Sequence, residues 1–263
     1  MKTLNDLVAD YGWDNFNSMT KYPSILTYHS LGDKGGVVDT LNFDASSLSE
    51  NELLYATEKI DGTNSRIVFW RDDYVIGSRE DLLYAKGDRI VNNTMSIVKT
   101  VRPVAERILP YVNSHDQLVV VYGETYGKGI NSGREYTKQD TTHFRVFDIV
   151  IQSNVEEILQ MDRGAISSWR EHDGQAFVPN SQRMELPFAK HLEFVPHTET
   201  IEAGQMPTRL VDTFEWLQRF AVTRAGIDHQ GHAEGVVIRN DTRSFIRKIR
   251  FEDYEKAKKK GMF

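Results

Sequence analysis

Two runs of residues that favour extended backbone, separated by a tight turn, place the strongest constraint on how this chain can fold. The runs cover residues 54–57 and 65–70, and Asp61-Gly62-Thr63 lies between them. β-Branched and aromatic residues favour strands and Asp-Gly favours a turn, so the sequence predicts two neighbouring strands. Lys59 then stands at the end of the first strand, where the loop begins.

A lysine in this position, with Glu58 and Asp61 as near neighbours in the sequence, is a candidate nucleophile. An ordinary lysine amine has a pKa of about 10.4 and must lose a proton before it can attack phosphorus. Desolvation or nearby cationic groups promote that loss. On this motif alone a solvated lysine in a turn is the simpler interpretation, so the remaining segments decide the matter.

The composition is typical of a globular protein, with 263 residues, 40% hydrophobic content and 27% charged content. The sequence holds no cysteine, which excludes disulfides and thiolate metal sites. We expect a cytoplasmic protein without membrane association, because no apolar run approaches membrane-spanning length. The net charge is −6, yet residues 239–260 hold nine basic side chains against four acidic ones. That segment predicts either a localised phosphate contact or a solvated C-terminal helix.

Further predicted strands carry charged or aromatic residues at or near their ends. They are residues 74–78 before Arg79, 118–123 before Glu124, 144–151 with Phe144 and Phe147, 233–239 with Glu234, and 244–250 with Lys248 and Arg250. A carboxylate at the end of an apolar strand is costly unless it is paired, metal-bound or ligand-bound. The two-residue period places Lys248 and Arg250 on one face. Arg79 could hold a phosphate or a ribose hydroxyl, or form a surface salt bridge with Glu80 or Asp81.

The overall pattern predicts an α+β protein with antiparallel sheets flanked by helices. Apolar spacing predicts helices over about 93–113, 155–161, 166–171 and 209–224, and a short one near residues 4–11. We expect one domain over residues 1–263. It would have a largely irregular N-terminal segment at 1–50 and a basic C-terminal tail at 251–263.

The motifs, taken in order, resemble those of the covalent nucleotidyltransferase superfamily of polynucleotide ligases and messenger RNA capping enzymes. The order is Lys-x-Asp-Gly-x-Asn, Arg, Gly-Glu, Phe-Asp, Glu-Gly-Val-Val and basic-x-basic, over roughly residues 20–255. The Lys21-Tyr22-Pro23-Ser24-Ile25 segment and Asn64 look most like the Rnl2-like, ATP-dependent RNA ligases. The resemblance implies an adenylyltransferase domain with an ATP-grasp-like ligase core. It would lack a C-terminal OB barrel, because only a short segment follows Arg250.

The resemblance also implies a role for each matching residue. Lys59 would attack the α-phosphorus of ATP to form a lysine–AMP intermediate, and Lys248 and Arg250 would complete the catalytic set by holding the α-phosphate. Mg²⁺ or Mn²⁺ would be bound by Glu234 and Asp61. The implied nucleotide-binding residues are Glu58, Ile60, Asn64, Arg79, Glu124, Phe147 and Lys248, with Phe147 stacking on adenine and Phe144 as the alternative. Arg250 departs from the usual lysine, and an arginine binds phosphate as a fork.

The implied function is an RNA ligase acting in RNA repair. AMP would pass from Lys59 to an RNA 5′-phosphate, and a 3′-hydroxyl would then displace it and seal the two ends. The alternatives are a DNA ligase-like enzyme of the same mechanism and a non-catalytic protein that binds nucleotides or RNA ends. The expected partners are ATP and RNA with 5′-phosphate and 3′-hydroxyl ends. A homodimer or an accessory protein could replace the missing C-terminal domain.

Overall fold

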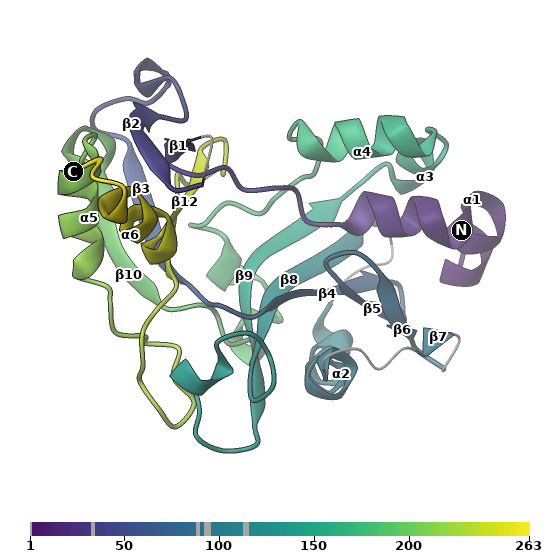
Figure 1. Cartoon of the computed structure of the whole chain (residues 1–263). Coiled ribbons are helices and arrows are strands. Elements are labelled where there is room, and N and C mark those ends of the chain that lie inside the picture. The colour runs from purple at the N-terminus through teal and green to yellow at the C-terminus, as the bar shows by residue number, and fades with distance from the viewer. Residues whose placement is uncertain (1, 33–34, 88–89, 92–95, 113–115) are drawn as a thin grey trace. The chain divides into compact units, whose positions relative to one another are not determined.

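A computed structural model describes residues 2–32, 35–87, 90–91, 96–112 and 116–263. It consists of antiparallel sheets and helices, which confirms the expected α+β class (Figure 1). Contacts divide the chain into two compact units, each assembled from separate stretches of sequence. Unit 1 comprises residues 1–24, 62–131 and 141–194, and unit 2 comprises residues 25–61, 132–140 and 195–263. Over the described residues no sheet closes into a barrel, and no helix is both long and apolar enough to cross a membrane.

Unit 1 is built on an antiparallel sheet with the strand order β7-β6-β5-β4-β8-β9. Its strands are β4 (Thr63–Trp70), β5 (Asp73–Ser78), β6 (Leu82–Ala85), β7 (Ile90–Val91), β8 (Leu118–Gly127) and β9 (Thr142–Gln152). Its α-helices are α1 (Leu4–Thr20), α2 (Ile97–Ile108), α3 (Val155–Leu159) and α4 (Arg163–Glu171). Side chains alternate along β4, so Ile67 packs in a core with Val101 of α2 while Val68 packs in another with Leu7 of α1. The sheet is therefore covered by helices on both faces.

Unit 2 contains a four-stranded antiparallel sheet in the order β10-β3-β11-β12 and a small sheet of β1 and β2. The strands are β1 (His29–Leu31), β2 (Val37–Leu41), β3 (Leu53–Lys59), β10 (His197–Glu202), β11 (Gly235–Arg239) and β12 (Ile246–Arg250). The α-helices are α5 (Leu210–Gln218) and α6 (Phe251–Lys259). Leu54, Val236 and Ile249 share a buried core with Leu217 of α5 and Tyr254 of α6. The other sheet face carries the charged residues singled out by the sequence.

Short 3-10 helices occupy several connections. They are Ala45–Ser47, Leu109–Tyr111, Gly133–Glu135, Arg183–Glu185, Ala189–His191 and Ala203–Gln205.

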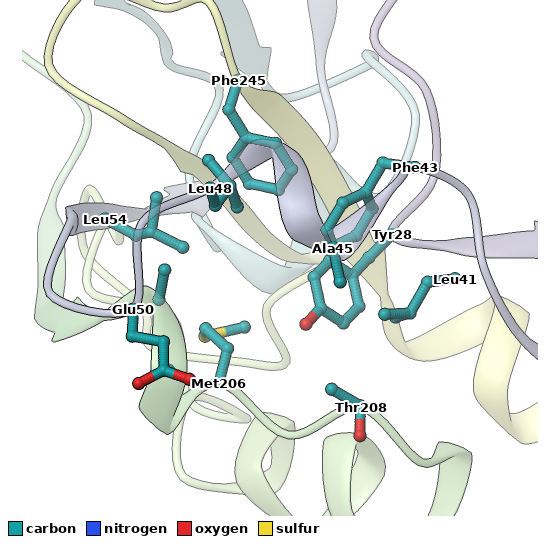
Figure 2. A pocket seen from close by; sticks show the side chains of 12 residues that line it. Tyr28, Leu41, Phe43, Ala45, Leu48, Glu50, Leu54, Met206, Thr208 and Phe245 are labelled. Atoms are coloured by element: carbon teal, nitrogen blue, oxygen red, sulfur yellow. The ribbon is translucent and has the colours of Figure 1, made fainter.

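An apolar pocket of about 210 Å³ opens on unit 2, and Figure 2 shows the side chains around it. Its lining includes Tyr28, Leu41, Phe43, Leu48, Leu54, Met206 and Phe245, with Glu50 and Thr208 as polar members. Leu54 shares its side of β3 with Ala56 and Glu58, because strand residues alternate between faces. Lys59 therefore points to the opposite side of the sheet, and this pocket is separate from the lysine.

Several expected helix boundaries are wrong. Helix α1 runs to Thr20 because it continues across a kink at Gly12, which has a φ of 81°. Helix α5 ends at Gln218, well before the expected end near residue 224. Residues 251–259 of the expected basic tail form helix α6, in line with the C-terminal helix that the sequence left open, but one face of it is buried in the core of unit 2. Helix α2 contains Pro103 in its interior. Of the helix expected over 93–113, residues 93–95 and 113 lie outside the described residues.

Candidate active site

Three neighbouring strands of unit 2 place Lys59, Lys248 and Arg250 on one face of the sheet. Lys59 is opposite Gly235 of β11, and Gly235 is in turn opposite Arg250 of β12. Lys248 lies two residues before Arg250 and therefore points to the same face. The expected grouping of the lysine with the two later cations is thus present within this unit.

Gly235 is required at the centre of this row. Its φ is 154°, and a Cβ atom there would lie 2.1 Å from the Ile249 carbonyl oxygen and 2.8 Å from Arg250 Cα. Because both are backbone atoms, no side chain can be added without displacing β12.

Glu234 completes the charged group beside Lys59. The Lys59 Nζ donates to Glu234 Oε2 at 2.6 Å, and the two side chains are 26% and 18% exposed. Burial raises the pKa of the Glu234 carboxyl, and the adjacent Lys59 opposes that rise. The negative charge of Asp61 raises the same pKa further. The lysine and both expected metal ligands therefore belong to one electrostatic cluster.

Arg250 is held by Asp253, an aspartate in the first turn of α6. Arg250 Nε and Nη2 donate to Asp253 Oδ2 and Oδ1, each at 2.8 Å. Burial tends to lower the pKa of Arg250, but Asp253, with a smaller effect from Glu234, raises it above its usual value. The guanidinium therefore stays charged in a fixed geometry.

The Glu58 side chain does not lie on the Lys59 face of the sheet, where direct nucleotide binding would require it. It is 4% exposed and points to the core side of β3, away from Lys59. Its carboxyl group accepts hydrogen bonds from Thr223 Oγ1, from the Arg224 N–H at 2.7 Å and from the Ala225 N–H at 3.1 Å. The side chain thus anchors a loop. Ile60, the other expected contact beside the lysine, is 3% exposed.

Tyr136 is a member of the site that the sequence did not reveal. It is 0% exposed, and its hydroxyl oxygen accepts the Asp61 N–H at 2.7 Å. Its carbonyl oxygen accepts the Ile227 N–H at 2.8 Å. Burial raises the pKa of the Tyr136 hydroxyl, so it stays protonated. Tyr136 therefore fixes the backbone two residues after Lys59.

Unit 1 brings together Asn64 and Glu124, two of the expected nucleotide contacts. They are directly opposite each other on β4 and β8, so their side chains share a face. The Asn64 Oδ1 atom is buried and accepts no hydrogen bond from the described residues. An unsatisfied buried acceptor is rare in a native protein and indicates a site for a missing partner.

Arg79 follows β5 in unit 1 and is largely exposed, with an ion pair to Glu80 at 3.7 Å. Its backbone is held by Arg66, a fully buried residue that was not predicted. The Arg66 guanidinium donates to the carbonyl oxygens of Ser78 and Arg79. Arg79 thus extends from a turn whose backbone is stabilised by Arg66.

The two candidate stacking residues on β9 differ in their surroundings. Phe144 is 6% exposed and lies in a hydrophobic core, where its ring would be 2.5 Å from a Cβ atom added at Gly123. Phe147 is half-buried, and its ring centroid is 4.9 Å from that of Tyr22. Only Phe147 therefore keeps part of its ring accessible.

The donor set of unit 2 fits a magnesium-type cation, although no group of three or more metal-ligating side chains occurs among the described residues. Mg²⁺ is commonly held by one or two carboxylates together with substrate phosphates and water. Glu234 and Asp61 supply such a pair.

Comparisons with known proteins identify the fold and the family. The family model described as RNA ligase matches residues 52–258. Two structures of Naegleria gruberi RNA ligase variants with ATP and Mn superpose with TM-scores of 0.53 and 0.56 at 18% identity, covering 90% and 98% of this chain. This chain spans 64% and 69% of those proteins, so they are longer. No significant match was found among curated proteins. The fold is therefore that of an RNA ligase nucleotidyltransferase, and the chain belongs to the RNA ligase family.

Proposed function

We propose that the chain is an ATP-dependent RNA ligase of the Rnl2-like type, acting through a lysine–AMP intermediate on Lys59. One observation carries this proposal. The Lys59 amine lies against Glu234 and on the same sheet face as Lys248 and Arg250. A nucleophile, an acid and two cations on one face suit nucleotidyl transfer, where positioning and charge neutralisation do most of the catalysis.

In the first step Lys59 Nζ forms a bond to the α-phosphorus of ATP. The bond between that phosphorus and the bridging oxygen breaks, and pyrophosphate leaves. Nucleotide binding must first separate Lys59 from Glu234, because an amine that donates to a carboxylate at 2.6 Å is not directed at phosphorus. Lys248 and Arg250 would neutralise the charge that develops on the α-phosphate oxygens.

Residues of unit 1 supply the proposed contacts to the nucleoside. The buried, unsatisfied Asn64 Oδ1 is suited to accept a ribose hydroxyl. Glu124 lies beside it and would bind the ribose as well. Phe147 would stack on adenine, because its ring is half-buried rather than enclosed. Arg79 would contact a phosphate from its exposed position.

Glu234 and Asp61 would hold the divalent cation, and the Naegleria gruberi structures with ATP and Mn support a nucleotide–metal pair. The bound cation would neutralise charge on the ATP phosphates. For Glu58 we propose a structural role in place of direct nucleotide contact, since its carboxyl group is engaged by residues 223–225. Ile60 remains a proposed contact to the nucleotide.

In the later steps AMP would move from Lys59 to the 5′-phosphate of an RNA end, and a 3′-hydroxyl would displace it. RNA repair, a cytoplasmic location, and a homodimer or accessory partner stay predictions from the sequence. The single-domain organisation over residues 1–263 is likewise a proposal.

Incubation with α-labelled ATP and Mg²⁺ or Mn²⁺, followed by nicked duplexes, tests the proposal. We expect label on the protein and sealing of nicks with RNA on the 3′-hydroxyl side, both lost in Lys59→Ala. The control Lys99→Ala removes an exposed lysine of α2 and should change neither result. Equal sealing with DNA on that side would favour the DNA ligase-like alternative. Nucleotide binding without protein labelling would favour the non-catalytic binder.

A further inference from the structure

Arg250 lies in surroundings that suit an arginine. It is the last residue of β12 and the N-cap of α6, so its side chain leaves the sheet at the junction with the helix. Neighbouring strands are about 4.8 Å apart, so Lys59 and Arg250 are separated by about 10 Å across Gly235. A flexible side chain at that distance needs a second contact to be held in place.

That contact is Asp253, which is 3% exposed and lies on the buried side of α6. Phe251 and Tyr254 of the same helix are anchored in the hydrophobic core of unit 2, so the carboxylate has a fixed position. It binds Nε and Nη2 of Arg250, each at 2.8 Å. The remaining nitrogen, Nη1, donates to none of the described residues.

We propose that Asp253 is a positioning residue that holds one edge of the Arg250 guanidinium. The remaining N–H groups of Arg250 are then directed at the α-phosphate of the nucleotide bound beside Lys59. The inference rests on the proposed ligase function. A guanidinium has five N–H donors in a planar fork and can bind a carboxylate and a phosphate together. A lysine ammonium at this position has one nitrogen, and Asp253 would draw it away from the phosphate.

The start of α5 offers a matched comparison. Arg209 is the N-cap of that helix and Asp212 lies three residues later, as Arg250 and Asp253 do in α6. This pair makes one contact at 3.6 Å, with side chains 70% and 50% exposed. The Arg-x-x-Asp spacing alone therefore does not produce the two-bond contact seen between Arg250 and Asp253. The buried carboxylate at 253 does.

Single-turnover formation of the protein–AMP adduct, measured against ATP concentration, tests the proposal. Asp253→Asn should lower the maximal rate about 100-fold, the loss typical of a misplaced catalytic group, and raise the half-saturating ATP concentration. Arg250→Ala should show a similar loss. The double variant should be no slower than Arg250→Ala, because Asp253 acts only through Arg250. Asp212→Asn should match the wild type.

Two outcomes would overturn the inference while the wild type still forms adduct. One is an Asp253→Asn rate within about twofold of wild type. The other is multiplication of the two losses in the double variant, which indicates independent roles. If Asp253→Asn does not fold, Arg250→Lys replaces it, with an expected loss of about 10-fold; wild-type activity would refute the need for a fork. A wild type that forms no adduct contradicts the proposed function itself.

Discussion

Replacing Glu58 by alanine should strongly destabilise the protein, because the carboxyl group is a buried anchor next to the nucleophile. It accepts from Thr223 Oγ1 and from the N–H groups of Arg224 and Ala225. Thr223 is 1% exposed, so its hydroxyl cannot reach water after truncation, whereas the Ala225 N–H keeps Thr223 Oγ1 as a second acceptor at 3.1 Å. A buried donor without a partner costs about 1 to 3 kcal/mol. Loss of this acceptor, together with the charge-assisted bonds to the two N–H groups, predicts a loss of roughly 3 kcal/mol in the free energy of unfolding.

Glu58→Gln should cost much less, about 1 kcal/mol. The amide oxygen can still accept the two backbone N–H groups, and its NH₂ can face Thr223 Oγ1, which rotates to accept. Comparing the losses in the free energy of unfolding of Glu58→Ala and Glu58→Gln therefore tests the hydrogen-bond geometry rather than the size of the side chain. Since small domains are stable by about 5 to 15 kcal/mol, the alanine variant should stay folded at low temperature.

Urea unfolding at fixed pH measures both variants, and adduct formation is then compared under conditions where each is folded. Glu202→Ala is the control, because in the described part of the chain its carboxylate makes one hydrogen bond, an exposed one from Gln205. It should change the free energy of unfolding by less than about 1 kcal/mol. Equal stability losses for alanine and glutamine at position 58, or an alanine loss below about 1 kcal/mol, would refute the anchoring role.

Gly235, Tyr136 and His29 can each be tested by a single substitution. Gly235→Ala should cost about 2 to 5 kcal/mol of stability in urea unfolding, because its Cβ would lie 2.1 Å from a backbone oxygen; wild-type stability would contradict the register of β11 and β12. Tyr136→Phe should slow adduct formation about 10-fold, because the Asp61 N–H loses its acceptor and the segment after Lys59 loosens. An unchanged rate would show that this bond does not order the lysine. Burial lowers the pKa of His29, so its neutral form contributes stability above pH 6.5 that is lost as pH falls towards the lowered value. His29→Gln should remove that part of the pH dependence of unfolding, and an unaltered profile would contradict it.

Local patterns in the sequence were sufficient for the strands that carry the site. The two-residue alternation and the Asp61-Gly62 turn predict β3 and β4, and the same alternation places Lys248 and Arg250 on one face. Their meeting with Lys59 and Glu234 was expected from the resemblance, and it follows physically from strand order, with β11 between β3 and β12. Strand β10 was missed because its residues are largely polar and half-exposed.

The supporting residues could not be predicted, because each acts through a contact distant in sequence. Tyr136 lies in a stretch without periodicity, and only the folded chain shows its bond to Asp61. Helix α5 ends at Gln218, and beyond it the N–H groups of Arg224 and Ala225 donate to Glu58, a contact distant in sequence that no local pattern predicts. One signal was present: Glu58 shares the face of Leu54 and Ala56, which indicates burial.

Locating AMP on the protein decides whether Lys59 is the nucleophile. After incubation with ATP and Mg²⁺, the wild-type chain is digested and the masses of its peptides are measured by mass spectrometry. The account predicts one adenylylated peptide containing Lys59, with the modification on the lysine nitrogen and none formed by Lys59→Ala. AMP attached at another residue, or no adduct on a folded protein that binds ATP, would contradict it.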